Sequence, residues 1–188
     1  MTDREQATDL ILRELSETLP AIDESQFVQL INELMVPGRR VLVMGVGRVL
    51  IALKAWVKRL VHLGIDINYV GDESEGPLHK NDLLIVGSSS GESKLPVRIA
   101  QIAAETIGAS VFYVGCTAGS SVDRLADSRL ILKGRTKFAT ENEYPSQQPM
   151  SSLFEQQVFL LGDVLALEIM RRRNWTEERV KQNHANLE

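Results

Sequence analysis

The 188-residue sequence contains one cysteine, few aromatic side chains (5%) and no long apolar run. A single cysteine, Cys116, cannot form an intramolecular disulfide, which predicts a reducing, cytoplasmic setting. No stretch reaches the roughly 20 apolar residues that cross a bilayer, and the charged N-terminus lacks the apolar core of a signal peptide. The net charge of −4 does not favour a nucleic-acid partner. These absences argue against membrane, secreted and disordered classes.

Hydrophobic residues make up 44% of the chain, enough for one domain spanning residues 1–188. We expect N-terminal helices within 1–36, a sheet core over 40–132 and C-terminal helices within 149–188. The expected strands are 40–44, 65–70, 82–87, 110–115 and 129–132. Strands that alternate with helical patterns are typical of a parallel sheet. The sequence therefore predicts an α/β fold with three layers, α/β/α, around a five-stranded parallel sheet of flavodoxin-like order.

Two unusual turns follow the first and third expected strands. Gly45-Val46-Gly47-Arg48 follows the first strand, and Ser88-Ser89-Ser90-Gly91-Glu92-Ser93, the serine turn, follows the third. Open α/β sheets bind ligands beyond the carboxyl ends of their strands, where the strand order reverses. In a flavodoxin-like order this point lies between the first and third strands. We therefore expect both turns to border one crevice.

The serine turn has the chemistry of an anion site. Serine hydroxyls and backbone N–H groups at a helix N-terminus are donors, and the helix dipole favours negative charge there. The alternative is a capping box formed by Ser89 and Glu92. Four serines in six residues exceed what capping needs, so we favour a phosphate site that requires no metal.

Other binding motifs have little support. The Gly45-x-Gly47 pair lacks the third glycine of a dinucleotide fingerprint because position 50 is leucine, and no Walker A pattern occurs. No cysteine or histidine pair shows metal-ligand spacing, so neither a metal nor another cofactor is expected.

Glu155 is the candidate for acid–base chemistry. It lies in the first turn of the apolar helix expected over 151–173, where a carboxylate could act as a general base. The alternative is a capping box with Ser152, which the residue pattern alone favours. His62 and His79 are more typical of packing or surface positions, and His184 of a loosely ordered tail.

Six segments together resemble a known family. The segments typical of a sugar isomerase (SIS) domain are Gly45-x-Gly47-Arg48, Arg59-Leu60-x-His62-Leu63-Gly64, Asp82-Leu83-Leu84-Ile85 and Ser88-x-Ser90-Gly91-Glu92-Ser93. Two further segments, 148–156 (QPMSSLFEQ) and 184–188 (HANLE), resemble the 6-phospho-3-hexuloisomerase family. The resemblance covers nearly the whole chain.

The resemblance implies interconversion of D-arabino-hex-3-ulose 6-phosphate and fructose 6-phosphate through an enediol, with no cofactor. It also implies a five-stranded parallel sheet, a homotetramer with active sites at subunit contacts, and 3-hexulose-6-phosphate synthase as metabolic partner in the ribulose monophosphate pathway. The implied phosphate-binding residues are Ser88, Ser89, Ser90 and Ser93. Gly47 and Arg48 would form the opposite wall, Glu155 would be the base, and His184 would handle the oxygen protons, from a neighbouring subunit.

Two positions depart from the family pattern. Val49 and Leu50 stand where relatives carry serine and glycine, and valine cannot donate a hydrogen bond, which costs roughly 1.5–3 kcal/mol of phosphate binding. The acidic loop, residues 72–75, stands where relatives carry threonines. These departures keep open two alternatives, a non-catalytic phosphosugar sensor and an isomerase of another phosphosugar.

Overall fold

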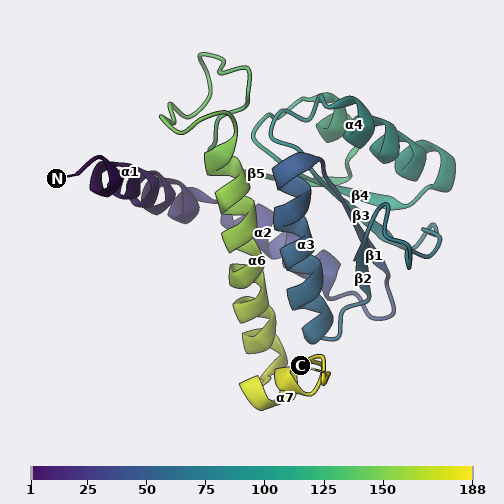
Figure 1. Ribbon diagram of the computed structural model, residues 1–188. Coiled ribbons are helices and arrows are strands. Elements are labelled where there is room, and N and C mark those ends of the chain that lie inside the picture. Colours follow the sequence, from purple (N-terminus) through teal and green to yellow (C-terminus); the bar gives the residue numbers. More distant parts are fainter. Residues whose placement is uncertain (1, 188) are drawn as a thin grey trace.

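Five parallel strands form the sheet in the order β2-β1-β3-β4-β5 in the computed structural model, which describes residues 2–187 (Figure 1). The strands are β1 (Val41–Met44), β2 (Ile67–Tyr69), β3 (Leu83–Gly87), β4 (Ser110–Gly115) and β5 (Ser128–Ile131). Val41 pairs with both Ile67 and Leu83, so β1 lies between β2 and β3. The flavodoxin-like order predicted from the sequence is confirmed.

Helices cover both faces of this sheet. They are α1 (Asp3–Thr18), α2 (Glu24–Leu34), α3 (Gly47–His62), α4 (Lys94–Gln101), α5 (Ser121–Leu125), α6 (Ser152–Arg173) and α7 (Glu177–Lys181). A 3₁₀ turn (Leu19–Ala21) follows α1, and a π-helical segment (Ile102–Ile107) continues α4. The sequence did not predict α5, because five residues are too few to show a helical period. No helix within residues 2–187 is long and apolar enough to span a membrane.

Alternating side chains of the strands separate two cores. Val41 and Val43 face a core with α2, α3 and α6, whereas Leu42 and Met44 face a core with α4 and α5. Burial on both faces explains why the central strands β1 and β3 are apolar without interruption.

The helices α3 and α6 run side by side on one face of the sheet (Figure 1). A Cβ added to Gly162 would lie 2.3 Å from Trp56 Cδ1, so only glycine permits this close approach. The Trp56 indole N–H donates to the carbonyl of Val158, which satisfies its polar atom inside the core. The helix α1 projects from the body, and the segment 133–150, which contains no helix or strand, lies above the start of α6 (Figure 1).

Candidate active site

The turns after β1 and β3 lie side by side at the carboxyl edge of the sheet. A Cβ on Gly45 would lie 3.3 Å from Val49 Cγ1, and one on Gly87 would lie 3.0 Å from the same atom. The first turn of α3 therefore packs against the ends of both strands. Gly47 begins this helix with φ +57°, a conformation that glycine adopts without strain. Val49 is buried at the position where the family pattern has serine.

Internal hydrogen bonds hold the serine turn in shape. The Ser88 side chain is buried, and its Oγ accepts from the Gly91 N–H at 3.1 Å. The Ser88 carbonyl accepts from the Tyr113 hydroxyl at 2.9 Å, and the Ser90 Oγ accepts from the Glu92 N–H at 3.3 Å. Burial raises the pKa of Tyr113, so this phenol remains a donor at neutral pH. The backbone of the turn is thus ordered before any ligand arrives.

Several donors of the serine turn remain available to an anion. Within residues 2–187, the N–H groups of Ser89 and Ser90 donate to no other group. Ser93 is the N-cap of α4, and its hydroxyl makes no capping hydrogen bond. Together with the dipole of α4, these donors suit a phosphate.

The capping box between Ser89 and Glu92, which the sequence left as the alternative, does not form. The Glu92 carboxylate accepts instead from Ser121, at 2.8 Å from its N–H and 2.7 Å from its hydroxyl, at the start of α5. These bonds lower the pKa of Glu92. The only carboxylate within the serine turn is therefore turned toward α5.

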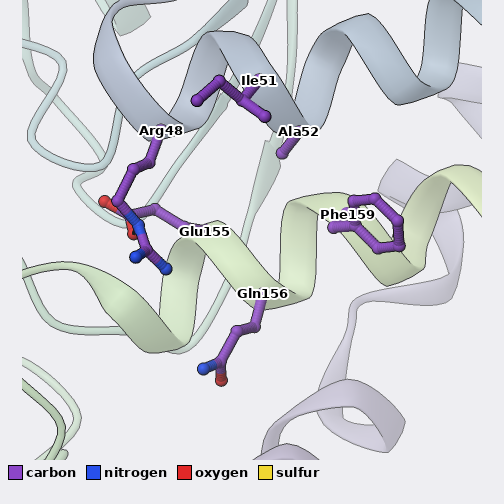
Figure 2. A pocket seen from close by; sticks show the side chains of 6 residues that line it. All are labelled: Arg48, Ile51, Ala52, Glu155, Gln156 and Phe159. Atoms are coloured by element: carbon purple, nitrogen blue, oxygen red, sulfur yellow. Dashed lines mark hydrogen bonds and ion pairs between the residues drawn. The ribbon is translucent and has the colours of Figure 1, made fainter.

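Arg48 and Glu155 form an ion pair between α3 and α6 (Figure 2). The Glu155 side chain is 12% exposed, whereas Arg48 is 67% exposed. The Ser151 hydroxyl donates to Glu155 Oε1 at 3.0 Å. The expected capping box with Ser152 is absent, because the carboxylate accepts from Arg48 and from Ser151. Sequence reasoning missed Ser151, although it stands one helical turn before Glu155.

A pocket of about 330 Å³ opens beside this ion pair. Figure 2 shows Glu155 pointing toward Arg48, whereas Gln156 points away from α3. The pocket is lined by Arg48, Ile51, Ala52, Glu155, Gln156 and Phe159.

The start of α6 and the serine turn pack around Cys116. A Cβ on Gly134 would lie 2.7 Å from Cys116 Sγ and 3.4 Å from Phe154 Cβ. The Cys116 N–H donates to the Ser89 carbonyl at 2.9 Å. Burial raises the pKa of the Cys116 thiol, which makes it a packing group rather than a nucleophile. Cys116 therefore joins the serine turn to Gly134, which lies against Phe154 at the start of α6.

His184 lies far from Glu155 within one chain. Its ring centroid is 4.9 Å from that of His62, and the adjacent Asn183 amide donates to the His62 carbonyl at 2.9 Å. His62 ends α3 whereas Arg48 begins it, and a rise of roughly 1.5 Å per residue separates them by about 21 Å. The structure thus brings together Glu155, Arg48, Gly47 and the serine turn, but not His184.

The acidic loop satisfies its own carboxylates. Asp72 accepts from the Ser74 N–H at 2.8 Å and from the Ser74 hydroxyl at 2.5 Å. These bonds hold the pKa of Asp72 well below its usual range. Glu75 accepts from the Gly71 N–H. Across residues 2–187, no group of three acidic, histidine or cysteine side chains is placed to hold a metal ion.

A parallel sheet with a serine-rich anion turn and a carboxylate at its carboxyl edge is typical of sugar-phosphate isomerases. 3-Hexulose-6-phosphate isomerase of Bacillus subtilis (strain 168) is 32% identical to this chain over 95% of each. The Mycobacterium gastri protein of the same name is 30% identical over 95% of this chain and 88% of its own. No family model matches the sequence.

Solved structures agree with these relatives. A crystal structure from Methanococcus jannaschii, from which a function of 3-hexulose-6-phosphate isomerase was inferred, is 27% identical with a TM-score of 0.76, over 96% of both chains. The chain belongs to the 3-hexulose-6-phosphate isomerase family and is an isomerase.

Proposed function

We propose that this protein interconverts D-arabino-hex-3-ulose 6-phosphate and fructose 6-phosphate. The observation that carries the proposal is a largely buried carboxylate, Glu155, paired with Arg48 in the first turn of α3, which packs against the strand end that leads into a turn with unused amide donors. An isomerase of a phosphoketose requires both parts, a base for the carbon-bound proton and an anchor for the phosphate.

The serine turn binds the phosphate in this proposal. The N–H groups of Ser89 and Ser90 donate to phosphate oxygens, and the N-terminal dipole of α4 favours the negative charge. Gly47 and Arg48 form the opposite wall, where the guanidinium adds positive charge. The hydroxyls that complete the phosphate site are Ser88, Ser89, Ser90 and Ser93.

Glu155 acts as the base. It removes the proton from C2 of the 3-ketose while O3 gains a proton, which gives a 2,3-enediol. It then returns the proton at C3 while the hydroxyl on C2 loses its proton, so that the carbonyl moves to C2. His184 handles the two oxygen protons. Arg48 and Ser151 hold the carboxylate from two sides, which fixes its orientation toward the substrate. One carboxylate that takes and returns a single proton needs no redox cofactor.

His184 reaches the site from a neighbouring subunit of a homotetramer in this proposal, because it is remote from Glu155 in its own chain. Exposed apolar side chains on α3 and α6 support burial of this face by another copy, namely Ile51, Phe159 and Leu167. Light scattering coupled to size exclusion measures the oligomeric state, and a monomer would contradict this part of the proposal.

The substrate would come from a 3-hexulose-6-phosphate synthase, which condenses formaldehyde with ribulose 5-phosphate in the cytoplasm. The test is therefore a coupled assay in which such a synthase feeds the purified protein, and fructose 6-phosphate is read through NADP reduction. We expect formation of product that depends on this chain.

The variant Glu155→Gln tests the base. We expect kcat to fall by about 10²- to 10⁴-fold, with fructose 6-phosphate still bound. Glu168→Gln is the matched control, because Glu168 also lies on α6 but pairs with Arg172 far from the pocket. A Glu155→Gln enzyme with full activity would refute the role of Glu155.

A second candidate function is the isomerisation of another phosphosugar. Burial of Val49 at the carboxyl edge favours it, since this side chain donates no hydrogen bond to a phosphate. Turnover of a different ketose phosphate, with no product from hexulose 6-phosphate, would support this candidate.

A further inference from the structure

One buried carboxylate outside the candidate active site stands out on an exposed helix. Glu14 lies on α1, which projects from the body, yet it is 3% exposed. Glutamate is rarely this buried unless it is paired or hydrogen-bonded, because loss of hydration penalises the charged form. The environment of Glu14 must therefore supply donors.

Three consecutive residues supply these donors. Ser146 Oγ lies 2.6 Å from Glu14 Oε2, the Gln147 N–H donates to Oε1 at 2.8 Å, and Gln148 Nε2 donates to Oε2 at 2.9 Å. Ser146 and Gln148 are themselves buried. Hydrogen bonds to an ionised acceptor are about twice as strong as neutral ones. Glu14 therefore holds residues 146–148, near the end of the segment 133–150, against α1. We call these three hydrogen bonds the clamp.

The clamped residues lead directly into the start of α6. Gln148 Oε1 accepts from Gln156 Nε2 at 2.8 Å, and Gln156 lines the pocket beside Glu155. Two residues further on, Met150 has φ +57°, a left-handed conformation that residues with a side chain rarely adopt. Such strain persists only where the surroundings enforce it. Ser151, which donates to Glu155, follows immediately.

We propose that Glu14 is a positioning residue for the isomerase site. Its carboxylate holds residues 146–148 in place. These residues in turn set the positions of Ser151 and Gln156, which flank Glu155 in the first turn of α6. The inference rests on the proposed function for its catalytic consequence. Its structural part, the coupling of α1 to the start of α6, stands independently of the substrate.

The same loop and helix offer a matched control. The Tyr144 hydroxyl donates to Glu17 at 2.5 Å, an exposed contact between the segment 133–150 and α1 that raises the pKa of Tyr144 to about 12. Glu17 accepts no hydrogen bond from 146–148. The variant Glu17→Gln therefore perturbs the contact between loop and helix without releasing the clamp.

The experiment compares the full-length wild type with Glu14→Gln, Gln148→Ala and Glu17→Gln. Hydrogen–deuterium exchange of peptides covering 147–156 is measured in each protein, together with kcat and KM in the coupled assay. In Glu14→Gln, an NH₂ group replaces one carboxylate oxygen. This group faces donors of residues 146–148 and cannot accept from them, so hydrogen bonds that hold these residues are lost. We expect faster exchange over 147–156 and a fall in kcat of about 10- to 100-fold, with KM changed less than about threefold because the serine turn is intact.

We expect Gln148→Ala to produce the same pattern at smaller amplitude, and Glu17→Gln to leave exchange over 147–156 and kcat unchanged. If Glu14→Gln does not fold, Gln148→Ala carries the test, since Glu14 keeps two donors in that variant.

The double variant Glu14→Gln/Gln148→Glu moves the carboxylate from position 14 to position 148, so that the two side chains exchange roles in their hydrogen bond. It should restore part of kcat. A purely structural role would lower the melting temperature without this rescue.

Two failures are distinguishable. Unchanged exchange over 147–156 in folded Glu14→Gln and Gln148→Ala overturns the positioning role, whether or not the wild type turns over hexulose 6-phosphate. A wild type without turnover overturns the proposed function. The exchange data would then still decide whether Glu14 couples α1 to the start of α6. Faster exchange with unchanged kcat in an active enzyme also overturns the positioning role.

Discussion

The serine turn and the acidic loop are both short polar connections at the carboxyl edge of one sheet, after β3 and β2. In the acidic loop, the N–H groups of Gly71 and Ser74 donate to carboxylates of the loop itself. In the serine turn, the N–H groups of Ser89 and Ser90 have no partner within residues 2–187, and Glu92 is bound by Ser121. The acidic loop is negatively charged and its carboxylates already accept from nearby N–H groups. The serine turn instead presents N–H donors that have no partner within residues 2–187.

This difference shows that the donors which a polar turn presents depend on where the local carboxylates go as much as on which residues are present. Both connections contain serine and glutamate. The serine turn leads into α4, whose dipole favours an anion. The acidic loop leads into no helix. Four predictions test this comparison, from the largest expected effect to the smallest.

The variant Ser89→Asp would make the serine turn resemble the acidic loop. A carboxylate about 5 Å from the phosphate costs roughly 3 kcal/mol at an effective dielectric constant near 20, which weakens binding on the order of 100-fold. Calorimetric titration with fructose 6-phosphate measures the Kd. Ser74→Asp in the acidic loop is the control, with little expected change. Equal Kd values for Ser89→Asp and wild type would contradict the assignment of the phosphate site.

The variant Gly91→Ala would break the shape of the serine turn. Gly91 has φ +65°, and a Cβ there would lie 2.0 Å from Ser120 Oγ and 2.8 Å from the Tyr113 hydroxyl oxygen. We expect a loss of about 2–4 kcal/mol in the free energy of unfolding, from strain and overlap together. Urea denaturation measures this loss.

Gly119→Ala separates the two causes of that loss. Gly119 has φ +74°, but nothing lies within 4 Å of an added Cβ. Its replacement should cost only the backbone strain of about 1–2 kcal/mol. Equal losses for both variants would show that the contacts with Ser120 and Tyr113 do not constrain the turn.

The variant Glu92→Gln tests the bond that turns the carboxylate of the serine turn toward α5. Hydrogen bonds from Ser121 lower the pKa of Glu92 in the folded protein, so its contribution to stability is present above the unfolded pKa near 4.5 and is lost as pH falls through the folded value. We expect the melting temperature to fall by about 1–3 °C at pH 7. The difference from wild type should shrink as the pH is lowered below 4.5 and Glu92 becomes protonated in the folded protein. A difference that stays constant as the pH falls would exclude the charged form as its source.

The double variant Asp72→Asn/Glu75→Gln tests how far the acidic loop acts on the anion site. Its strand, β2, lies two strand positions from β3, roughly 10 Å away, which exceeds the screening length of about 8 Å at physiological salt. We expect the Kd for fructose 6-phosphate to improve less than about threefold at low salt and not at all at high salt. A larger effect would mean that the acidic loop opposes the ligand directly.

Much of the fold was predictable because its signals are local. All five strands expected from the sequence are present in the sheet. The serine turn and the turn at Gly47 were also found as motifs. The helix α5 was missed because it is too short for a period.

The partners of the carboxylates were not predictable in the same way. A capping box does form where Glu5 and Thr2 begin the exposed helix α1. The two boxes considered from the sequence, at Glu92 as an alternative and at Glu155 as the favoured interpretation, do not form, because Ser121 and Arg48 offer those carboxylates tertiary donors. On an exposed helix, the glutamate carboxylate binds its local capping partner. Where helices pack on the sheet, the carboxylate binds a donor from elsewhere in the chain instead.

The sequence alone determined the layers, the strand order and the serine turn, since periodicity and turn chemistry act over a few residues. Only the tertiary structure decided that Glu155 pairs with Arg48, that Glu14 holds 146–148, and that His184 lies at the far end of α3. These pairs join residues more than 100 positions apart. Which donors reach a carboxylate is settled by how helices pack on the sheet, and no local pattern encodes that packing.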